Sequence, residues 1–457
     1  MSATTTTDKQ SSRRAWSVAL GALLCMISAS VPLSGLSFYH PYLFAVMGAQ
    51  GIPQSTVLLY YTLMMLSIVG SMMFIGGPLL PKVGTRPLMI VGSLVVAAAL
   101  VLFANANSPV WLYAAGILLG IGYGSSFQLV PMVWVNNWFV ARKGLVVGLV
   151  TGGTGIGGVL WSNLIPTLAG KPASGNYAYQ FPYYIMAIVV VGLTIPATFL
   201  LATPERPSLI GLLPLGATPP DPNALPSARE ASRPLPGFTR AQALRTPWLW
   251  LIFACSVLLG VVHAASQIMA PYLTMRVTAA PPVGLGQQLT FFSLAMSVWT
   301  IGLIVMKPLL GVLNDKLGIM WAFIIAAALQ ASFFFFLPMY ANFGTLVPVL
   351  MMLTMSAGMS VGTVEPPLIT ASAMGPRDFG KIWAVTGSAY TLGLAVGAPV
   401  WGLFYNASTK SYDTGFLLAP IILAVVVVGS IIGTNAGRRQ HHRLHARELA
   451  AWEAEEE

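Results

Sequence analysis

Long apolar runs separated by short polar turns make up most of this chain. A helix rises about 1.5 Å per residue and a bilayer core is about 30 Å thick, so about 20 apolar residues make one crossing. With proline, glycine and charge as boundaries, the pattern predicts twelve membrane-spanning helices. They cover residues 16–47, 56–80, 87–106, 109–134, 144–169, 181–202, 246–275, 287–313, 319–338, 343–372, 380–406 and 413–435. The first run is longer than a crossing needs and contains Pro32 and Pro41, so we expect a kink or break in it.

Composition places the chain in lipid. Hydrophobic residues make up 56% of it and charged residues only 8%, against about 25% charged residues in a typical soluble domain. Both cysteines fall in apolar runs, so we expect no disulfide. The formal charge of +10 is a feature that nucleic-acid-binding proteins share. The positions of the basic residues indicate membrane orientation instead, and we expect no nucleic-acid partner.

The basic residues and a proline-rich interval suggest how the chain is divided. Residues 203–245 contain no apolar run long enough to span, which predicts a solvated linker between six-helix bundles at 1–202 and 246–435. Residues 436–457 form a basic and then acidic tail, expected to be a short surface helix. With both termini and the even-numbered turns on one side, that side holds 19 of the 23 Lys and Arg residues. The positive-inside rule then places the termini and linker in the cytoplasm of a cell, which we expect to be bacterial.

Two turns repeat a pattern at a constant displacement. The turn after the second span, residues 77–86, reads GPLLPKVGTR, and the turn after the eighth span, residues 311–318, reads GVLNDKLG. A second correspondence, Thr151-Gly152 with Thr386-Gly387, has nearly the same displacement. A short turn often contains Gly and Lys by chance, but two correspondences favour parallel duplication of a six-helix unit, as in one large transporter class. The residues of the two turns are Gly77, Lys82, Gly84 and Arg86, and Gly311, Asp315, Lys316 and Gly318.

These turns resemble the signature of the major facilitator superfamily. The second copy matches well, whereas the first has Pro81 where the family usually has Asp and Thr85 where it often has Arg. That Asp helps to latch the cytoplasmic side in the family, so the resemblance implies an altered latch in the N-terminal half. Residues 138–149, WFVARKGLVVGL, are similar to the start of helix 5 in monocarboxylate transporters and oxalate/formate antiporters. There Arg142 and Lys143 would anchor the turn, and the following glycines would let helix backbones approach closely.

Lys307 is a charge in the middle of an apolar run. It lies eight residues before Asp315, or about 12 Å deeper along a helix. A charge at that depth needs a cavity or a partner, unless the lysine snorkels to the surface. In the monocarboxylate transporters and oxalate/formate antiporters, a basic residue of helix 8 is associated with the substrate carboxylate. This residue directly precedes a Pro and lies four residues before the glycine of the turn. Lys307, Pro308 and Gly311 have that spacing, with Lys where Arg is usual. The monocarboxylate branch tends to have Asp four residues earlier, where this chain has Leu303, so that proton relay is not implied.

Apart from Asp413, the first residue of the last span, Glu365 is the one acidic residue inside a predicted span. It lies twelve residues before Arg377, at a depth comparable to that of Lys307. Because pairing is the least costly arrangement for two buried opposite charges, we expect a Glu365–Lys307 pair. Two versions remain open. Glu365 neutralises Lys307 in the empty state and protonates or moves away when an anion binds, or the two form a fixed ion pair between helices 8 and 10.

Two histidines lie nearer the external ends of their predicted helices. His40 is in the first span and His263 in the seventh. Either could gate transport or relay protons. The alternative is a neutral imidazole that bonds to a backbone carbonyl.

Further polar side chains are deep enough to line a cavity, although ordinary interhelical hydrogen bonding is an equal alternative. Tyr123 and Tyr390 resemble positions where antiporter relatives have aromatic site walls. Tyr42 follows a proline where animal carriers have a lysine, and span 11 has only Lys381 at its start, so the second cations of those groups are missing. The full set of candidate lining residues is Tyr42, Tyr123, Gln128, Asn163 and Tyr390.

Together these features predict a secondary active transporter with alternating access. We expect a small organic anion, a monocarboxylate, as substrate, coupled to protons or a counter-anion, carried by a monomer without cofactor or metal. One alternative is an exporter of cationic or drug-like compounds that uses Glu365, and another is a non-transporting receptor. The chain has no GxxxxGK[ST] or HExxH motif. Its GxSxG pattern at residues 358–362 falls inside a predicted span and not at the strand-to-helix turn that a nucleophile elbow needs, so neither an ATP-driven pump nor a membrane enzyme is expected.

Overall fold

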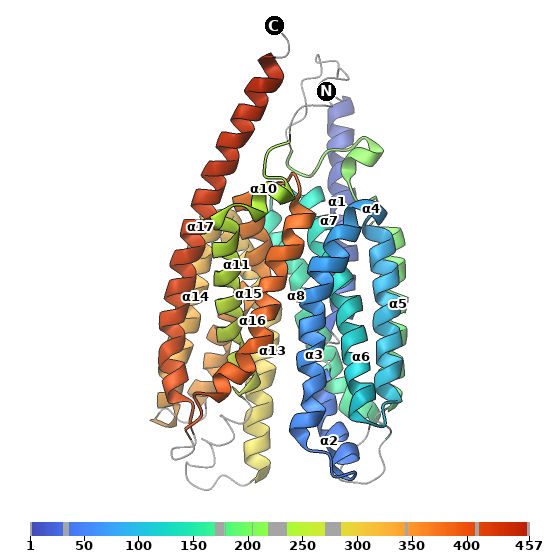
Figure 1. Cartoon of the computed structure of the whole chain (residues 1–457), viewed down its shortest axis with the longest axis vertical. Helices are drawn as coiled ribbons and strands as arrows, with labels where there is room; N and C mark the ends of the chain where they lie inside the picture. The colour runs from blue at the N-terminus through green and yellow to red at the C-terminus, as the bar shows by residue number, and fades with distance from the viewer. Residues whose placement is uncertain are drawn as a thin grey trace.

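The computed structural model describes residues 2–30, 36–169, 178, 180–202, 204–217, 235–269, 285–342, 346–406 and 411–454. Within these ranges the chain is helical, apart from two isolated β-bridges. Most helices run along the long axis of the molecule, and both termini lie at one end of it (Figure 1). We call this the linker end, because α10 (Arg240–Leu244), which lies within the predicted linker, is also there (Figure 1).

The described part of the N-terminal half contains nine α-helices, several of which join into longer rods. Short π-helical turns, η3 (Met72–Gly76) and η4 (Tyr123–Phe127), connect α3 to α4 and α6 towards α7, and η6 (Ala197–Leu201) extends α9. The α-helices are α1 (Ser2–Ser28), α2 (His40–Gly48), α3 (Gln54–Ser71), α4 (Gly77–Val83), α5 (Thr85–Ala104), α6 (Pro109–Gly122), α7 (Val130–Trp138), α8 (Lys143–Ala169) and α9 (Gln180–Pro196).

The C-terminal half has the longest helices. Short 3₁₀ turns occur along the whole chain, at η2 (Leu36–Tyr39) in the N-terminal half, η7 (Pro207–Ile210) in the predicted linker, and η9 (Ala264–Gln267) and η10 (Leu337–Asn342) in the C-terminal half. The α-helices are α10 (Arg240–Leu244), α11 (Pro247–His263), α13 (Leu285–Leu317), α14 (Ile319–Phe336), α15 (Leu346–Met374), α16 (Phe379–Gly402) and α17 (Asp413–Ala454).

The helices form the expected twelve-span, two-bundle membrane fold. Ten of the described helices are long and apolar enough to cross a membrane. The first span is divided between α1 and α2, as its prolines predicted, and α16 occupies the position of the eleventh span. Large apolar side chains such as Phe74, Val110 and Ile188 are more than 70% exposed, which fits an outer surface that lipid covers.

The repeat seen in the sequence is also a repeat of packing. Helix α3 packs on α6 as α13 packs on α15, α5 packs on α9 as α14 packs on α17, and α1 packs on α8 as α11 packs on α16. Gly84 and Gly318 begin α5 and α14 with φ angles of 79° and 84°. Only glycine adopts that conformation without strain, which explains why both turns end in glycine. Between the halves, α8 packs on α13, and α3 and α4 pack on α16.

Glycines bring α8 and α13 into close contact across this interface. A Cβ at Gly144 would lie 2.8 Å from an oxygen of Asp315, and a Cβ at Gly148 would lie 2.9 Å from the carbonyl carbon of Lys307. Gly311 packs in turn against the backbone of Gly144. The close approach expected of the glycine series after Lys143 is therefore present, and the helix it brings near α8 carries Lys307.

At the linker end, the structure adds contacts to the predicted linker and contradicts the prediction for the tail. The described parts of the linker are docked on the bundles: Trp138 Nε1 donates to the Pro204 carbonyl at 3.0 Å, and the Phe238 amide donates to the Met374 carbonyl at 2.8 Å. The tail is not a separate short helix, because α17 continues to Ala454. Arg377 holds this extension through an ion pair of 2.7 Å with Glu448.

Candidate functional site

Lys307 lies on α13 and reaches across the interface to α8. Its side chain is 4% exposed. The ammonium donates to Thr154 Oγ1 at 2.8 Å and to the Thr151 carbonyl at 3.1 Å. Both partners are neutral, and among the described residues no carboxylate lies within ion-pair distance of this lysine. The side chain does not snorkel to the surface, so a buried cation without an anionic partner connects the two halves.

Glu365 does not pair with Lys307, so the expected ion pair was wrong. Its Oε1 accepts a hydrogen bond from Asn314 Nδ2 at 2.8 Å, and the carboxyl is 1% exposed. Asn314 lies seven residues after Lys307 on α13, or about 10 Å nearer the linker end. Glu365 on α15 therefore lies at the level of Asn314, while the ammonium finds its oxygens on α8. Each buried charge-bearing group meets neutral partners.

Two acceptor oxygens in the Glu365 pair are unsatisfied. Glu365 Oε2 and Asn314 Oδ1 are both buried and have no hydrogen-bond partner in the described structure. An ionised carboxylate with a single neutral donor in a buried site costs several kcal/mol. A proton on Oε2 removes that charge and provides a donor at this location.

A second group of polar residues joins the halves at α16. Gln128 Nε2 donates to Thr391 Oγ1 at 2.7 Å and to the Gly387 carbonyl at 3.1 Å. Tyr123, in the π-helical turn η4, and Tyr390, on α16, are both buried. The structure thus brings Gln128 against the stretch of α16 that carries Tyr390. None of their described bonds involves Lys307.

At the linker end, Asp315 joins α13 to the start of α8. Its two carboxylate oxygens accept from the Gly144 and Leu145 amides, both at 2.8 Å. These amides have no partner within their own helix, and a negative charge is favourable at a helix N-terminus. Lys143 donates to Asn136 Oδ1 and lies 5.6 Å from the ring of Phe379 on α16. We call the Asp315 contact the linker-end latch.

A scan against family models gives the match that the fold and latch suggest. Residues 18–279, more than half of the chain, match the model of the Major Facilitator Superfamily. The chain belongs to this superfamily. An oxalate:formate antiporter of Oxalobacter formigenes is 23% identical over 413 residues, 87% of this chain and 86% of that protein. The MFS-type transporter pynF of Aspergillus niger is 30% identical over 162 residues, 34% of this chain and 36% of that protein.

Solved structures of superfamily members show the same fold. The proton:xylose symporter XylE has a TM-score of 0.71 at 14% identity and covers 91% of this chain and 95% of its own. The human organic anion transporter MFSD10 has a TM-score of 0.60 at 17% identity and covers 90% of this chain and 99% of its own. The protein is therefore a multi-pass membrane transporter of the Major Facilitator Superfamily and not an enzyme.

His263 is part of the internal framework of this superfamily member. It is fully buried, with Nδ1 2.9 Å from the Tyr390 hydroxyl and Nε2 2.9 Å from Gln330 Oε1. Its partners are two side chains and not the backbone carbonyl of the alternative interpretation. The contact joins α11 to α16 through the Tyr390 hydroxyl. The side chains of His40, Tyr42 and Asn163 lie outside the described part of the structure.

Sequence reasoning missed the neutral partners of the two buried charge-bearing groups. Asn314 is on the same face of α13 as Lys307, since seven residues make nearly two turns, so helical spacing could have indicated it. Gln330 is an amide within an otherwise apolar span, which is also a visible signal. Nothing in the sequence indicated that Thr151 and Thr154 contact Lys307, because that contact depends on how α8 packs on α13. Lys82, Arg86, Arg142 and Lys316 are exposed or lie in turns at the linker end.

The latch predicts a conformational effect of Asp315→Asn. The neutral amide cannot accept from both the Gly144 and Leu145 amides, and it removes the charge at the start of α8. We expect the conformation that is closed at the linker end to lose about 1–2 kcal/mol of stability relative to the open one. This changes the ratio of the two populations about 5- to 30-fold. Spin labels at Val140 and Leu317, which are 60% and 49% exposed, measure the separation of the halves. The variant should populate longer distances.

The matched control is Glu448→Gln, which removes an acid at the same end. Glu448 pairs with Arg377 inside the C-terminal half and does not bridge the halves. Its distance distribution should equal that of the parent protein. A latch role is refuted if Asp315→Asn leaves the distribution unchanged or if both variants shift it equally.

Proposed function

We propose that the protein is a secondary active transporter of a small organic anion, a monocarboxylate, coupled to protons or to a counter-anion. The observation that carries the proposal is the Lys307 ammonium, which is buried at the interface of the halves and bonded only to neutral oxygens. A carboxylate would replace these contacts with shorter and stronger charge-assisted bonds. One cation suits one carboxylate.

The location of Lys307 supports transport by alternating access. Its bonds to α8 join the C-terminal half to the N-terminal half, so an anion that takes over the ammonium also changes the contacts between the halves. In this conformation α8 and α13 are packed together from Lys307 to the latch. By the positive-inside rule, this closed side faces the cytoplasm and holds both termini.

Glu365 favours protons as the coupling ion. It is buried without a cationic partner among the described residues, and its Oε2 has no donor. The neutral, protonated acid suits that environment. Glu365 lies on α15 and contacts α13, the helix that carries Lys307, through Asn314. Proton release would leave a negative charge about two turns from the lysine. That coupling would let protonation at Glu365 and anion binding at Lys307 influence each other.

Names of relatives agree with this substrate class. The relative from Oxalobacter formigenes exchanges oxalate and formate by its name, and MFSD10 is named an organic anion transporter. Both likenesses are below 25% identity, so they support an anionic substrate without identifying it.

Uptake into proteoliposomes tests the proposal. A panel of labelled monocarboxylates, one dicarboxylate and one organic cation is offered with and without an acidic exterior. We expect saturable uptake of at least one monocarboxylate, stimulated by the pH gradient, and counterflow when the vesicles are preloaded. Binding without counterflow would indicate a receptor. Movement of the cation alone would indicate an exporter. Either result, or no transport of any carboxylate, would overturn the proposal.

A further inference from the structure

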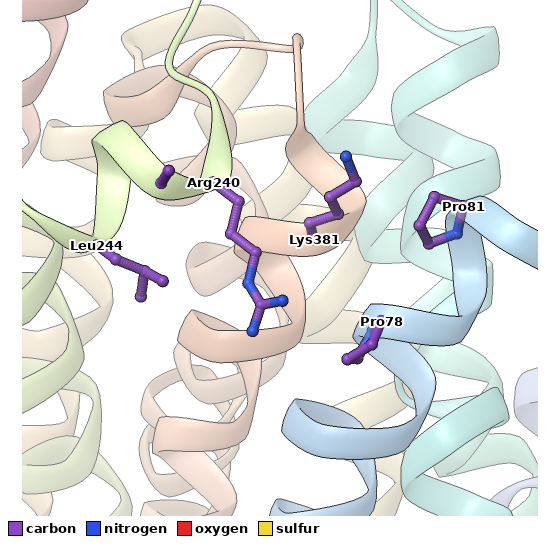
Figure 2. A pocket seen from close by; sticks show the side chains of 6 residues that line it. Pro78, Pro81, Arg240, Leu244 and Lys381 are labelled. Carbon is purple, nitrogen blue, oxygen red and sulfur yellow. The ribbon is translucent and has the colours of Figure 1, made fainter.

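A cavity of about 430 Å³ lies at the linker end where three parts of the chain meet. Helix α4 contributes from the N-terminal half, α10 from the segment between the halves, and α16 from the C-terminal half (Figure 2). Since α10 leads within a few residues into the membrane helix α11, the cavity lies near the edge of the bilayer. Its lining residues are Pro78, Pro81, Arg240, Ala241, Leu244 and Lys381.

Two basic residues line this cavity, and the nearby Asp378 pairs with the side chain of only one of them. Figure 2 shows the side chains of Arg240 and Lys381 between α10, α16 and the two prolines of α4. Lys381 Nζ lies 3.0 Å from Asp378 Oδ1, and the other oxygen of Asp378 accepts from the backbone amide of Arg240. Arg240 Nε is buried and has no hydrogen-bond partner in the described structure. One nitrogen of the guanidinium, itself out of contact with solvent, thus has no acceptor.

The cavity lies where the internal repeat lacks a carboxylate. Asp315 and Pro81 occupy the same position in the two repeated turns. In the C-terminal half, Asp315 joins α13 to the start of α8. In the N-terminal half, Pro81 lines an open space beside the start of α16, and nothing on α4 supplies the corresponding negative charge.

We propose that this cavity binds a phosphate group, which bridges α4, α10 and α16 in place of the missing carboxylate. The fixed fork of a guanidinium and a neighbouring ammonium match a phosphate well. Basic pockets between membrane helices on the cytoplasmic side bind anionic lipid headgroups. Leu244 and the prolines give apolar walls against which the first methylene groups of a lipid's acyl chains can pack. The same phosphate chemistry is available from free phosphate, so the test has an arm for each source.

Thermal unfolding of the full-length protein in delipidated dodecyl maltoside micelles tests this inference. Phosphatidylglycerol, phosphatidylcholine and inorganic phosphate are titrated separately. We expect phosphatidylglycerol, and not phosphatidylcholine, to raise the Tm. Arg240→Gln and Lys381→Gln should each weaken that effect about tenfold in concentration, since each removes one charge-assisted contact. Arg245→Gln is the matched control, because Arg245 is exposed just after α10 and does not line the cavity.

Pro81→Asp keeps the test decisive if a cation variant does not fold. It places a carboxylate where the phosphate would sit, so it should fold and lose the response to phosphatidylglycerol. A variant-dependent response to inorganic phosphate alone would assign the site to a free anion and still support a phosphate site. No response in the parent protein, or an equal response in all variants, would overturn the inference.

Discussion

At substrate concentrations below saturation, Lys307→Met is expected to lower the rate of carboxylate uptake by about 30- to 150-fold. Methionine matches the length and apolar body of the lysine and removes the charge. A hydrogen bond to a charged group contributes about 2–3 kcal/mol, which sets this range. Because the lost contact belongs to substrate binding, the KM should rise more than the maximal rate falls. Initial rates of labelled monocarboxylate uptake across a concentration series measure both quantities.

Two controls separate charge from packing. Lys307→Arg keeps the cation and should retain part of the uptake, although its larger head must fit against Thr151 and Thr154 of α8. Arg439→Ala removes an exposed charge from α17 and should transport at the parent rate. If Lys307→Met transports like the parent, the substrate site lies elsewhere. If Lys307→Arg is as inactive as Lys307→Met while both fold, the ammonium is structural.

The fold was largely predictable, because lipid imposes a simple rule on the sequence. Apolar runs of membrane length defined the spans. The repeated turn also carried three-dimensional information, since Gly84 and Gly318 share one unusual φ angle. The differences from prediction at the linker end concern polar segments of the sequence. The extension of α17 and the docked linker look solvated in sequence, yet Glu448 and Trp138 attach them to the bundles.

The burial of the two ionisable groups was predictable, and their pairing was not. Depth along a helix identified Lys307 and Glu365, because an ionisable residue at mid-span is costly and rare. Pairing depends on the rotation and offset of neighbouring helices, which apolar runs do not encode. The rule that opposite charges pair failed here because each group found neutral oxygens or amides closer than the other charge. Close approach of α8 at Gly148 decided this outcome for Lys307.

Glu365→Gln is expected to abolish uptake driven by a pH gradient while counterflow continues. Glutamine has the shape of the protonated acid, keeps an oxygen for Asn314 Nδ2, and offers a donor to the unsatisfied Asn314 Oδ1. It cannot release a proton. One pH unit contributes about 1.4 kcal/mol per proton, or about tenfold accumulation of substrate. The parent should show that accumulation with an acidic exterior, and the variant should only equilibrate.

Measuring both modes on the same vesicles separates coupling from folding. Glu453→Gln, which removes an exposed acid of α17, should retain both accumulation and counterflow. Full pH-driven accumulation by Glu365→Gln would place the coupling proton on another group. Loss of counterflow together with accumulation would make the Asn314 contact structural. Retained exchange with lost accumulation is the result that only a proton-carrying Glu365 gives, because exchange returns the transporter loaded and never requires the acid to deprotonate.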